Sequence, residues 1–158
     1  MSELYLRNRQ NVQAVNLPRL RRLCRILLAA MPGVRRYELG VFLVAAPEMT
    51  QLNERHLQHA GSTDVITFDY QDRADSEELL GDIFICLDEV LANAGRYRTP
   101  WTRELARYLV HGILHLRGFD DQAPVLRRRM KREENRWLGF LEAKASLNAL
   151  GSRGTSKP

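Results

Sequence analysis

Apolar residues along the chain follow two different periods, and each period predicts a different kind of element. Leu20, Leu23, Cys24 and Leu27 recur every three or four residues, which is the spacing of one helix face. The segment 37–45 is instead short and almost continuously apolar, which is typical of a buried strand. The same patterns predict helices over residues 17–31, 48–57, 88–97, 101–117 and 124–147, and strands over residues 4–8, 37–45, 63–70 and 79–87.

Four strands mixed with about five helices, without internal repeats or a mid-chain linker, predict a single α+β domain over residues 1–150. We expect a roughly four-stranded mixed sheet with flanking helices. The strands 63–70 and 79–87 are expected to pair as a hairpin across an acidic loop. Residues 151–158 are small and polar, which predicts a disordered tail.

Capping residues predict where the helices begin. Asn16 precedes Pro18, a combination that favours a helix start at this point. Asp88 is expected to cap the third helix, and Pro100 is expected to separate that helix from the fourth.

The fourth predicted helix carries the strongest chemical signal in the sequence. His111 and His115 are four residues apart, so a helix places both imidazoles on one face. Gly118 then permits a left-handed turn, after which the chain doubles back and Asp121 can approach the same point. Two imidazoles and one carboxylate suit zinc or a similar ion and leave a fourth position open for water.

Two other interpretations of this helix remain at this point. A pair of histidines with this spacing is common on polar helix stripes, and a metal-free α/β domain with two core histidines is a further alternative. The helix is otherwise largely apolar, so both histidines need polar partners. Glu104 lies on the same stripe as Arg107, Tyr108 and the histidines, and it is the expected hydrogen-bond acceptor behind the metal ligands.

Composition narrows the choice of partner. The 158 residues have a net charge of +5, which favours an anionic partner, with nucleic acid first. No apolar run is long enough to span a bilayer and no signal peptide is evident, so we expect no membrane partner. Cys24 and Cys86 both lie in apolar patterns, which predicts buried free thiols in a reducing cytoplasm.

Three stretches resemble one protein family. The segment 111–120 reads His-Gly-Ile-Leu-His-Leu-Arg-Gly-Phe-Asp, which is similar to the signature of the YbeY family, metal-dependent endoribonucleases of bacterial rRNA maturation. Leu52-Asn53 followed by 63–68 (Thr-Asp-Val-Ile-Thr-Phe), and then 80–83 (Leu-Gly-Asp-Ile), resemble two further family motifs in the same order. The resemblance covers about residues 37–138.

The resemblance implies an α+β fold with a mostly parallel four-stranded sheet around a central metal-binding helix. It implies one zinc-type ion per chain, no small-molecule cofactor, and single-stranded RNA, in particular rRNA or the ribosome, as partner. Two positions depart from the family pattern. Asp121 stands where the third ligand is usually histidine, and Leu57 stands where an arginine is usual, which leaves His59 as the nearest candidate for a phosphate contact.

The function expected from these observations is a single-strand-specific endoribonuclease of rRNA maturation and ribosome quality control. Basic residues such as Arg127, Arg128, Lys131 and those of segment 19–25 would bind the RNA backbone. The main alternative is an RNA-binding ribosome-assembly factor with a mainly structural metal. A metzincin-like protease has the same ligand spacing but needs Glu after the first histidine, where this chain has Gly112.

Overall fold

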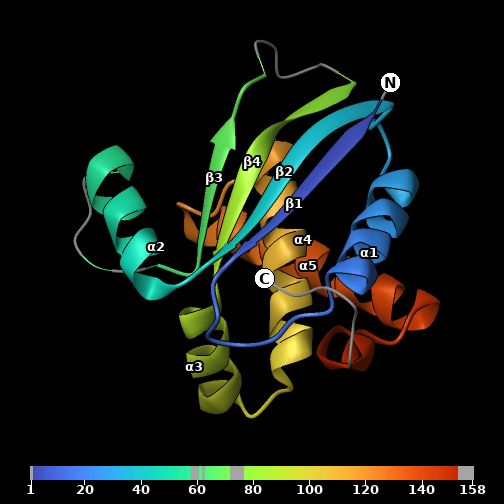
Figure 1. The fold of residues 1–158 in the computed structure, drawn as a ribbon. Helices are drawn as coiled ribbons and strands as arrows, with labels where there is room; N and C mark the ends of the chain where they lie inside the picture. Colours follow the sequence, from blue (N-terminus) through green and yellow to red (C-terminus); the bar gives the residue numbers. More distant parts are fainter. Residues whose placement is uncertain (1, 58–60, 62, 72–76, 153–158) are drawn as a thin grey trace.

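The sheet of the computed structural model has four strands in the order β1-β2-β4-β3 (Figure 1). The structure describes residues 2–57, 61, 63–71 and 77–152. The strands are β1 (Glu3–Arg9), β2 (Arg36–Val44), β3 (Val65–Asp69) and β4 (Glu78–Cys86). β1 and β4 both run parallel to β2, whereas β3 runs antiparallel to β4. The expected mixed, mostly parallel sheet and the expected hairpin are therefore confirmed.

The helices are α1 (Leu17–Ala30), α2 (Ala46–Leu52), α3 (Leu87–Tyr97), α4 (Trp101–Leu116) and α5 (Pro124–Lys144). A π-helical turn (Asn53–Leu57) extends α2, and a 3-10 helix (Leu147–Gly151) follows α5. Figure 1 shows α4 and α5 behind the sheet, with α1 to its right and α2 on the opposite side, to its left. None of the helices in the described part of the chain combines the length and the hydrophobicity that a membrane span requires.

The two faces of the sheet are buried to different extents. On one face, Leu39, Val41 and Leu43 of β2 are fully buried in the main core with α1 and α4. On the other face, a smaller cluster around Met49 and Phe84 is covered by α2. In the larger core α4 is the central helix, because it packs against the sheet on one side and against α3 and α5 on the others.

A glycine permits the close approach of α4 to the sheet. A Cβ atom at Gly112 would lie 2.7 Å from Cγ2 of Ile83 on β4, closer than carbon atoms normally approach. The absence of a side chain therefore lets the helix lie directly on the strand. The position of the histidines relative to the sheet depends on this contact.

Several predicted boundaries differ from the structure. α3 begins at Leu87 with Cys86 as its N-cap, so the prediction that Asp88 caps it is wrong. Asp88 instead accepts a 2.6 Å hydrogen bond from the backbone nitrogen of Ala46, and so joins the start of α2 to α3. The last helix ends at Lys144 rather than at residue 147, and part of the predicted tail, Gly151, belongs to the 3-10 helix.

Candidate metal centre

The end of α4 brings its two histidines close to the chain that follows. Gly118 has a φ of +96°, its backbone nitrogen donates to the oxygen of His115 at 3.0 Å, and the nitrogen of Phe119 donates to the oxygen of Leu114 at 3.0 Å. These two bonds form a Schellman motif, the usual left-handed helix end at glycine. The turn sends the following residues back along the helix, as the sequence predicted.

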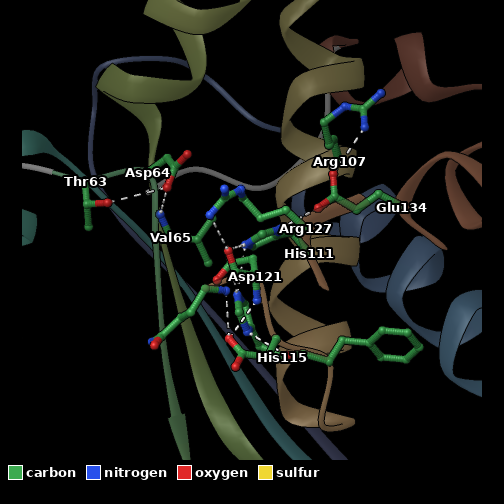
Figure 2. A network of polar contacts seen from close by, with 12 residues as sticks. Thr63, Asp64, Val65, Arg107, His111, His115, Asp121, Arg127 and Glu134 are labelled. Carbon is green, nitrogen blue, oxygen red and sulfur yellow. Dashed lines mark hydrogen bonds and ion pairs between the residues drawn. The ribbon is translucent and has the colours of Figure 1, made fainter. Parts of the chain in front are cut away.

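Three ligand-type atoms meet beside this turn (Figure 2). Nε2 of His111 lies 3.0 Å from Nε2 of His115. Oδ2 of Asp121 lies 3.6 Å from Nε2 of His111 and 3.5 Å from Nε2 of His115. The three atoms therefore form a nearly regular triangle, and all three side chains are partly exposed.

Asp120 has a different environment from its neighbour. Its Oδ1 accepts hydrogen bonds from the backbone nitrogens of Asp121 at 2.7 Å and of Gln122 at 3.1 Å. The carboxylate of Asp120 thus stabilises the turn, while that of Asp121 faces the histidines. This arrangement agrees with the predicted choice of Asp121 as the third residue of the cluster.

The outer nitrogen of each imidazole has an acceptor as its partner. Nδ1 of His111 lies 2.5 Å from Oε2 of Glu134, and Nδ1 of His115 lies 3.1 Å from the backbone oxygen of Phe119. Because both partners accept hydrogen bonds, each neutral ring carries its hydrogen on Nδ1 and presents a lone pair on Nε2. Two lone pairs and a carboxylate oxygen then converge on one point.

Glu134 of α5 has the role that the sequence assigned to Glu104. Glu134 is only 7% exposed, and Arg107 donates to its Oε1 at 3.2 Å. Glu104 lies two turns before His111 and instead contacts Thr99 and Arg107, so the expectation of Glu104 as the acceptor behind the ligands is wrong. A signal for Glu134 was present in the sequence, because it lies on the apolar stripe of α5 between Met130 and Trp137.

The electrostatic field at the triangle favours positive charge. Burial alone would lower the pKa of His111, but the hydrogen bond and charge of Glu134, together with Asp121 and Asp64, outweigh it and raise the pKa. Burial would raise the pKa of Glu134, but His111 and Lys131 outweigh it and lower the pKa. Both shifts have the same main cause, the contact between the imidazole of His111 and the carboxylate of Glu134, which stabilises positive charge on the ring.

The donor set fits a divalent ion of the zinc type. Ligands about 2.0–2.1 Å from a tetrahedral centre lie about 3.3–3.4 Å from one another, and the three observed separations of 3.0, 3.5 and 3.6 Å bracket that value. Without a cation or a proton between them, the two lone pairs would repel one another. His111, His115 and Asp121 can therefore hold such an ion and leave one position open.

A cavity of about 430 Å³ adjoins the triangle. His111 and Asp121 lie at one end, with Asp64, which directly precedes β3, and Glu134 from α5 beside them. Of the basic residues expected to bind RNA, Arg127 and Lys131 line this cavity, whereas Arg128 and the arginines of segment 19–25 do not. Leu57 ends the π-helical turn, and His59 lies outside the described residues, so a phosphate contact by His59 stays a prediction.

Comparison with known proteins connects this geometry to a family. A family model described as Endoribonuclease YbeY matches residues 5–142. A protein named Endoribonuclease YbeY from Phocaeicola vulgatus is 39% identical over 114 residues, which are 72% of this chain and 80% of that protein. One of the same name from Chlorobium luteolum is 37% identical over 118 residues, 73% of this chain and 84% of that one.

A solved structure agrees with the fold. The solution structure of TM1509 from Thermotoga maritima matches 99% of this chain and 100% of its own, with a TM-score of 0.68. The two sequences are 21% identical, so this likeness concerns the fold alone.

Proposed function

The chain belongs to the YbeY family of endoribonucleases, and from this premise we propose that it cuts single-stranded RNA with a divalent metal ion held by His111, His115 and Asp121. The observation that carries the proposal is the triangle of ligand atoms at the end of an open cavity. A structural zinc site is closed by four protein ligands, whereas a catalytic site keeps a position for water or substrate. Among the described residues, the cluster contains three ligands.

The proposed ion is zinc, one per chain, since two imidazoles and a carboxylate are a common catalytic set for it. When bound, such an ion activates a water molecule or neutralises charge on a phosphate oxygen. The protein's part is to orient the ligands: Glu134 and the carbonyl of Phe119 hold the imidazole rings by their Nδ1 atoms. Such outer partners fix the tautomer and raise the basicity of the ligands.

Basic side chains in the cavity support a phosphodiester substrate. Arg127 and Lys131 project from one face of α5 next to the proposed metal position. They can attract and align the RNA backbone, with an affinity that falls as salt rises. We propose rRNA, within maturation and quality control of the ribosome, as the RNA, and the cytoplasm as the site of action. The two buried free thiols support this compartment.

The peptidase alternative has a structural objection. A metzincin places its general base directly after the first histidine. Here that position is Gly112, which faces Ile83 of β4 so closely that a Cβ atom does not fit. A glutamate at this point of α4 would meet the sheet rather than the substrate.

The second candidate, an RNA-binding assembly factor whose metal is mainly structural, is favoured by one observation. Leu57 stands where the family resemblance leads us to expect an arginine that acts on RNA. Without that cation, RNA could bind in the cavity and remain uncut. The two functions therefore differ in cleavage and not in binding.

The test uses labelled single-stranded RNA with wild type, with His115→Ala and with chelator-treated wild type. We expect cleavage by wild type and a loss of roughly 100-fold or more in both other samples, because the metal supplies several kcal/mol of charge stabilisation. RNA binding should persist in His115→Ala. Binding by wild type without cleavage in any of several metals would favour the assembly factor, and cleavage of casein would contradict both functions.

A further inference from the structure

The cavity extends well beyond the metal triangle, along α4 toward its N-terminus. Its lining includes His111 and, eight residues earlier on the same helix, Arg103. At 1.5 Å per residue these positions are about 12 Å apart along the helix axis. The volume of about 430 Å³ lies within the range of small-molecule pockets. The triangle occupies one end, so most of this space remains for another part of a substrate.

An aromatic ring lies on the rim at the far end of the cavity. Tyr97 is the last residue of α3, lines the cavity and is 62% exposed, so most of the residue is open to solvent. Its backbone is well fixed: Arg98 follows in the left-handed conformation, and the nitrogen of Thr99 donates to the oxygen of Ala94 at 3.0 Å. An open aromatic ring on a fixed backbone is suited to stack on a nucleobase.

Positive charge on the opposite wall comes from α5. Arg103 is paired with Glu142, and Arg107 is paired with Glu134, so these two guanidinium groups are largely neutralised. Lys131 forms no ion pair with another residue that the structure describes. The contact found for Arg127 is a weak 3.4 Å hydrogen bond to the backbone oxygen of Asp121 (Figure 2). These two side chains are one helical turn apart and can bind one phosphate together.

A polar group between the two walls can meet the edge of a base. The side-chain nitrogen of Asn93 donates to the hydroxyl of Tyr108. Its Oδ1 atom has no partner within the described ranges, while Asn93 itself lines the cavity. An amide oxygen of this kind accepts hydrogen bonds from the amino or imino groups of bases.

We propose that this part of the cavity is a nucleotide subsite. The base of the nucleotide next to the phosphate at the metal position stacks on Tyr97 and meets Asn93, while Arg127 and Lys131 bind its phosphate. The inference rests on the proposed function, because it takes RNA as the substrate of the same site. It adds that the protein recognises a base beside the cleavage position, as well as the backbone.

The test is a thermodynamic cycle that combines substitutions of Tyr97 in the protein with abasic positions in the RNA. Wild type, Tyr97→Ala and Tyr97→Phe are titrated with a fluorescent single-stranded RNA pentamer and with pentamers that carry one abasic nucleotide at each position. Fluorescence anisotropy in chelator-containing buffer measures binding while the RNA stays intact. Tyr70→Ala is the matched control, since Tyr70 is 58% exposed and lies outside the cavity lining.

We expect Tyr97→Ala to weaken binding of the intact pentamer by about tenfold, the usual range for a lost stacking contact. One abasic position should weaken binding to wild type equally and should cause little further loss in Tyr97→Ala. Tyr97→Phe and Tyr70→Ala should bind like wild type. Equal binding of the intact pentamer by Tyr97→Ala and wild type would overturn the subsite. So would additive losses of binding free energy from Tyr97→Ala and from the abasic nucleotide, or an absence of RNA binding by folded wild type.

A second pair of variants tests the phosphate contact. Lys131→Ala should reduce the slope of log affinity against log salt by about one, whereas Lys144→Ala, on a distant turn of α5, should leave it unchanged. Equal slopes for all three proteins would contradict the assignment of Lys131.

Cleavage is then measured separately with metal. If the cycle shows coupling between Tyr97 and one base of the RNA but the RNA is never cut, the subsite is supported and the proposed nuclease function fails. If RNA is cut without coupling through Tyr97, the function stands and the subsite fails.

Discussion

At the scale of residues, the two nitrogens of each histidine have separate roles. Nε2 of His111 and of His115 face each other at 3.0 Å, while the Nδ1 atoms contact Glu134 and the backbone of Phe119. Glu134 is itself held by Arg107 at 3.2 Å. The position of the proposed metal ligands thus depends on residues that would not contact the metal.

The first prediction concerns Glu134. Glu134→Ala should weaken zinc affinity by about 10- to 100-fold, because outer partners of ligating histidines have effects of this size. Glu134→Gln should lie between Ala and wild type, since its amide oxygen still accepts a hydrogen bond from Nδ1 but carries no charge. Competition with a coloured chelator measures the affinity. Glu133→Gln is the control, as the neighbouring carboxylate faces Arg136 instead; an equal loss in this variant would contradict the assignment.

The second prediction separates Asp121 from Asp120. Asp121→Ala should remove a ligand and lower zinc affinity strongly, whereas Asp121→His should retain the ion, since imidazole is an equally suitable ligand. Asp120→Ala should reduce stability by about 1 kcal/mol through the two lost turn hydrogen bonds and should change zinc affinity much less. Zinc stoichiometry and chelator competition, measured on the purified proteins, rank the three variants by their loss of zinc affinity. A larger loss in Asp120→Ala would show that the ligand assignment is shifted by one residue.

At the scale of elements, α4 connects the site to the core. Its buried side chains are packed against the sheet and the neighbouring helices, and Gly112 allows it to lie directly on β4. A helix held this firmly fixes the two histidines relative to α5 and to the start of β3. The metal triangle and the cavity wall are therefore consequences of helix packing.

The third prediction tests the contact between α4 and β4. Alanine normally stabilises a helix relative to glycine by about 1 kcal/mol. In Gly112→Ala the new Cβ would meet the fully buried Ile83 at 2.7 Å, and overpacking of a core costs about 1–3 kcal/mol. We expect a net loss of up to about 2 kcal/mol in the free energy of unfolding, measured by urea denaturation.

Gly139→Ala on α5 is the matched control, because a Cβ there would meet no atom within 4 Å. This variant should gain about 0.5–1 kcal/mol. A gain in both variants would mean that the helix and the sheet have room between them. Ile83→Ala removes the Cγ2, Cγ1 and Cδ1 atoms that the new Cβ would meet, so a smaller loss of stability on Ile83→Ala in the Gly112→Ala protein than in wild type would locate the strain at this contact.

At the scale of the whole molecule, the sequence predicted what depends on local order and left out what depends on packing between helices. The hydrophobic periods gave the element order and the sheet, and the spacing of His111, Gly118 and Asp121 gave the cluster. Glu134 was missed because its contact with His111 spans 23 residues and requires α5 to lie against α4. The role of Asp88 was misassigned for a similar reason, since its partner, Ala46, lies on α2.

The same core makes the stability of the molecule depend on pH in the alkaline range. Cys24 of α1 is fully buried among the residues that face the sheet, and burial raises the pKa of its thiol from 9.0 to about 12. In the unfolded chain the thiol ionises near pH 9, while in the folded chain it stays protonated. The contribution of Cys24 is therefore fully present below pH 9 and is lost as pH rises from 9 toward 12.

The last prediction follows from this difference in the pKa of the thiol. Between pH 9 and 12 the free energy of unfolding of wild type should fall by about 1.4 kcal/mol per pH unit because of Cys24 alone. Cys24→Ala lacks this thiol, so its stability should fall less steeply over the same range, although its value at pH 8 is lower because a core cavity remains. Urea denaturation of both proteins at pH 8 and pH 10.5 gives the difference between the two slopes, in which groups common to both proteins, such as Tyr108, cancel. Parallel slopes would show that the Cys24 thiol ionises in the folded protein as readily as in the unfolded chain, and that the core around α1 admits water.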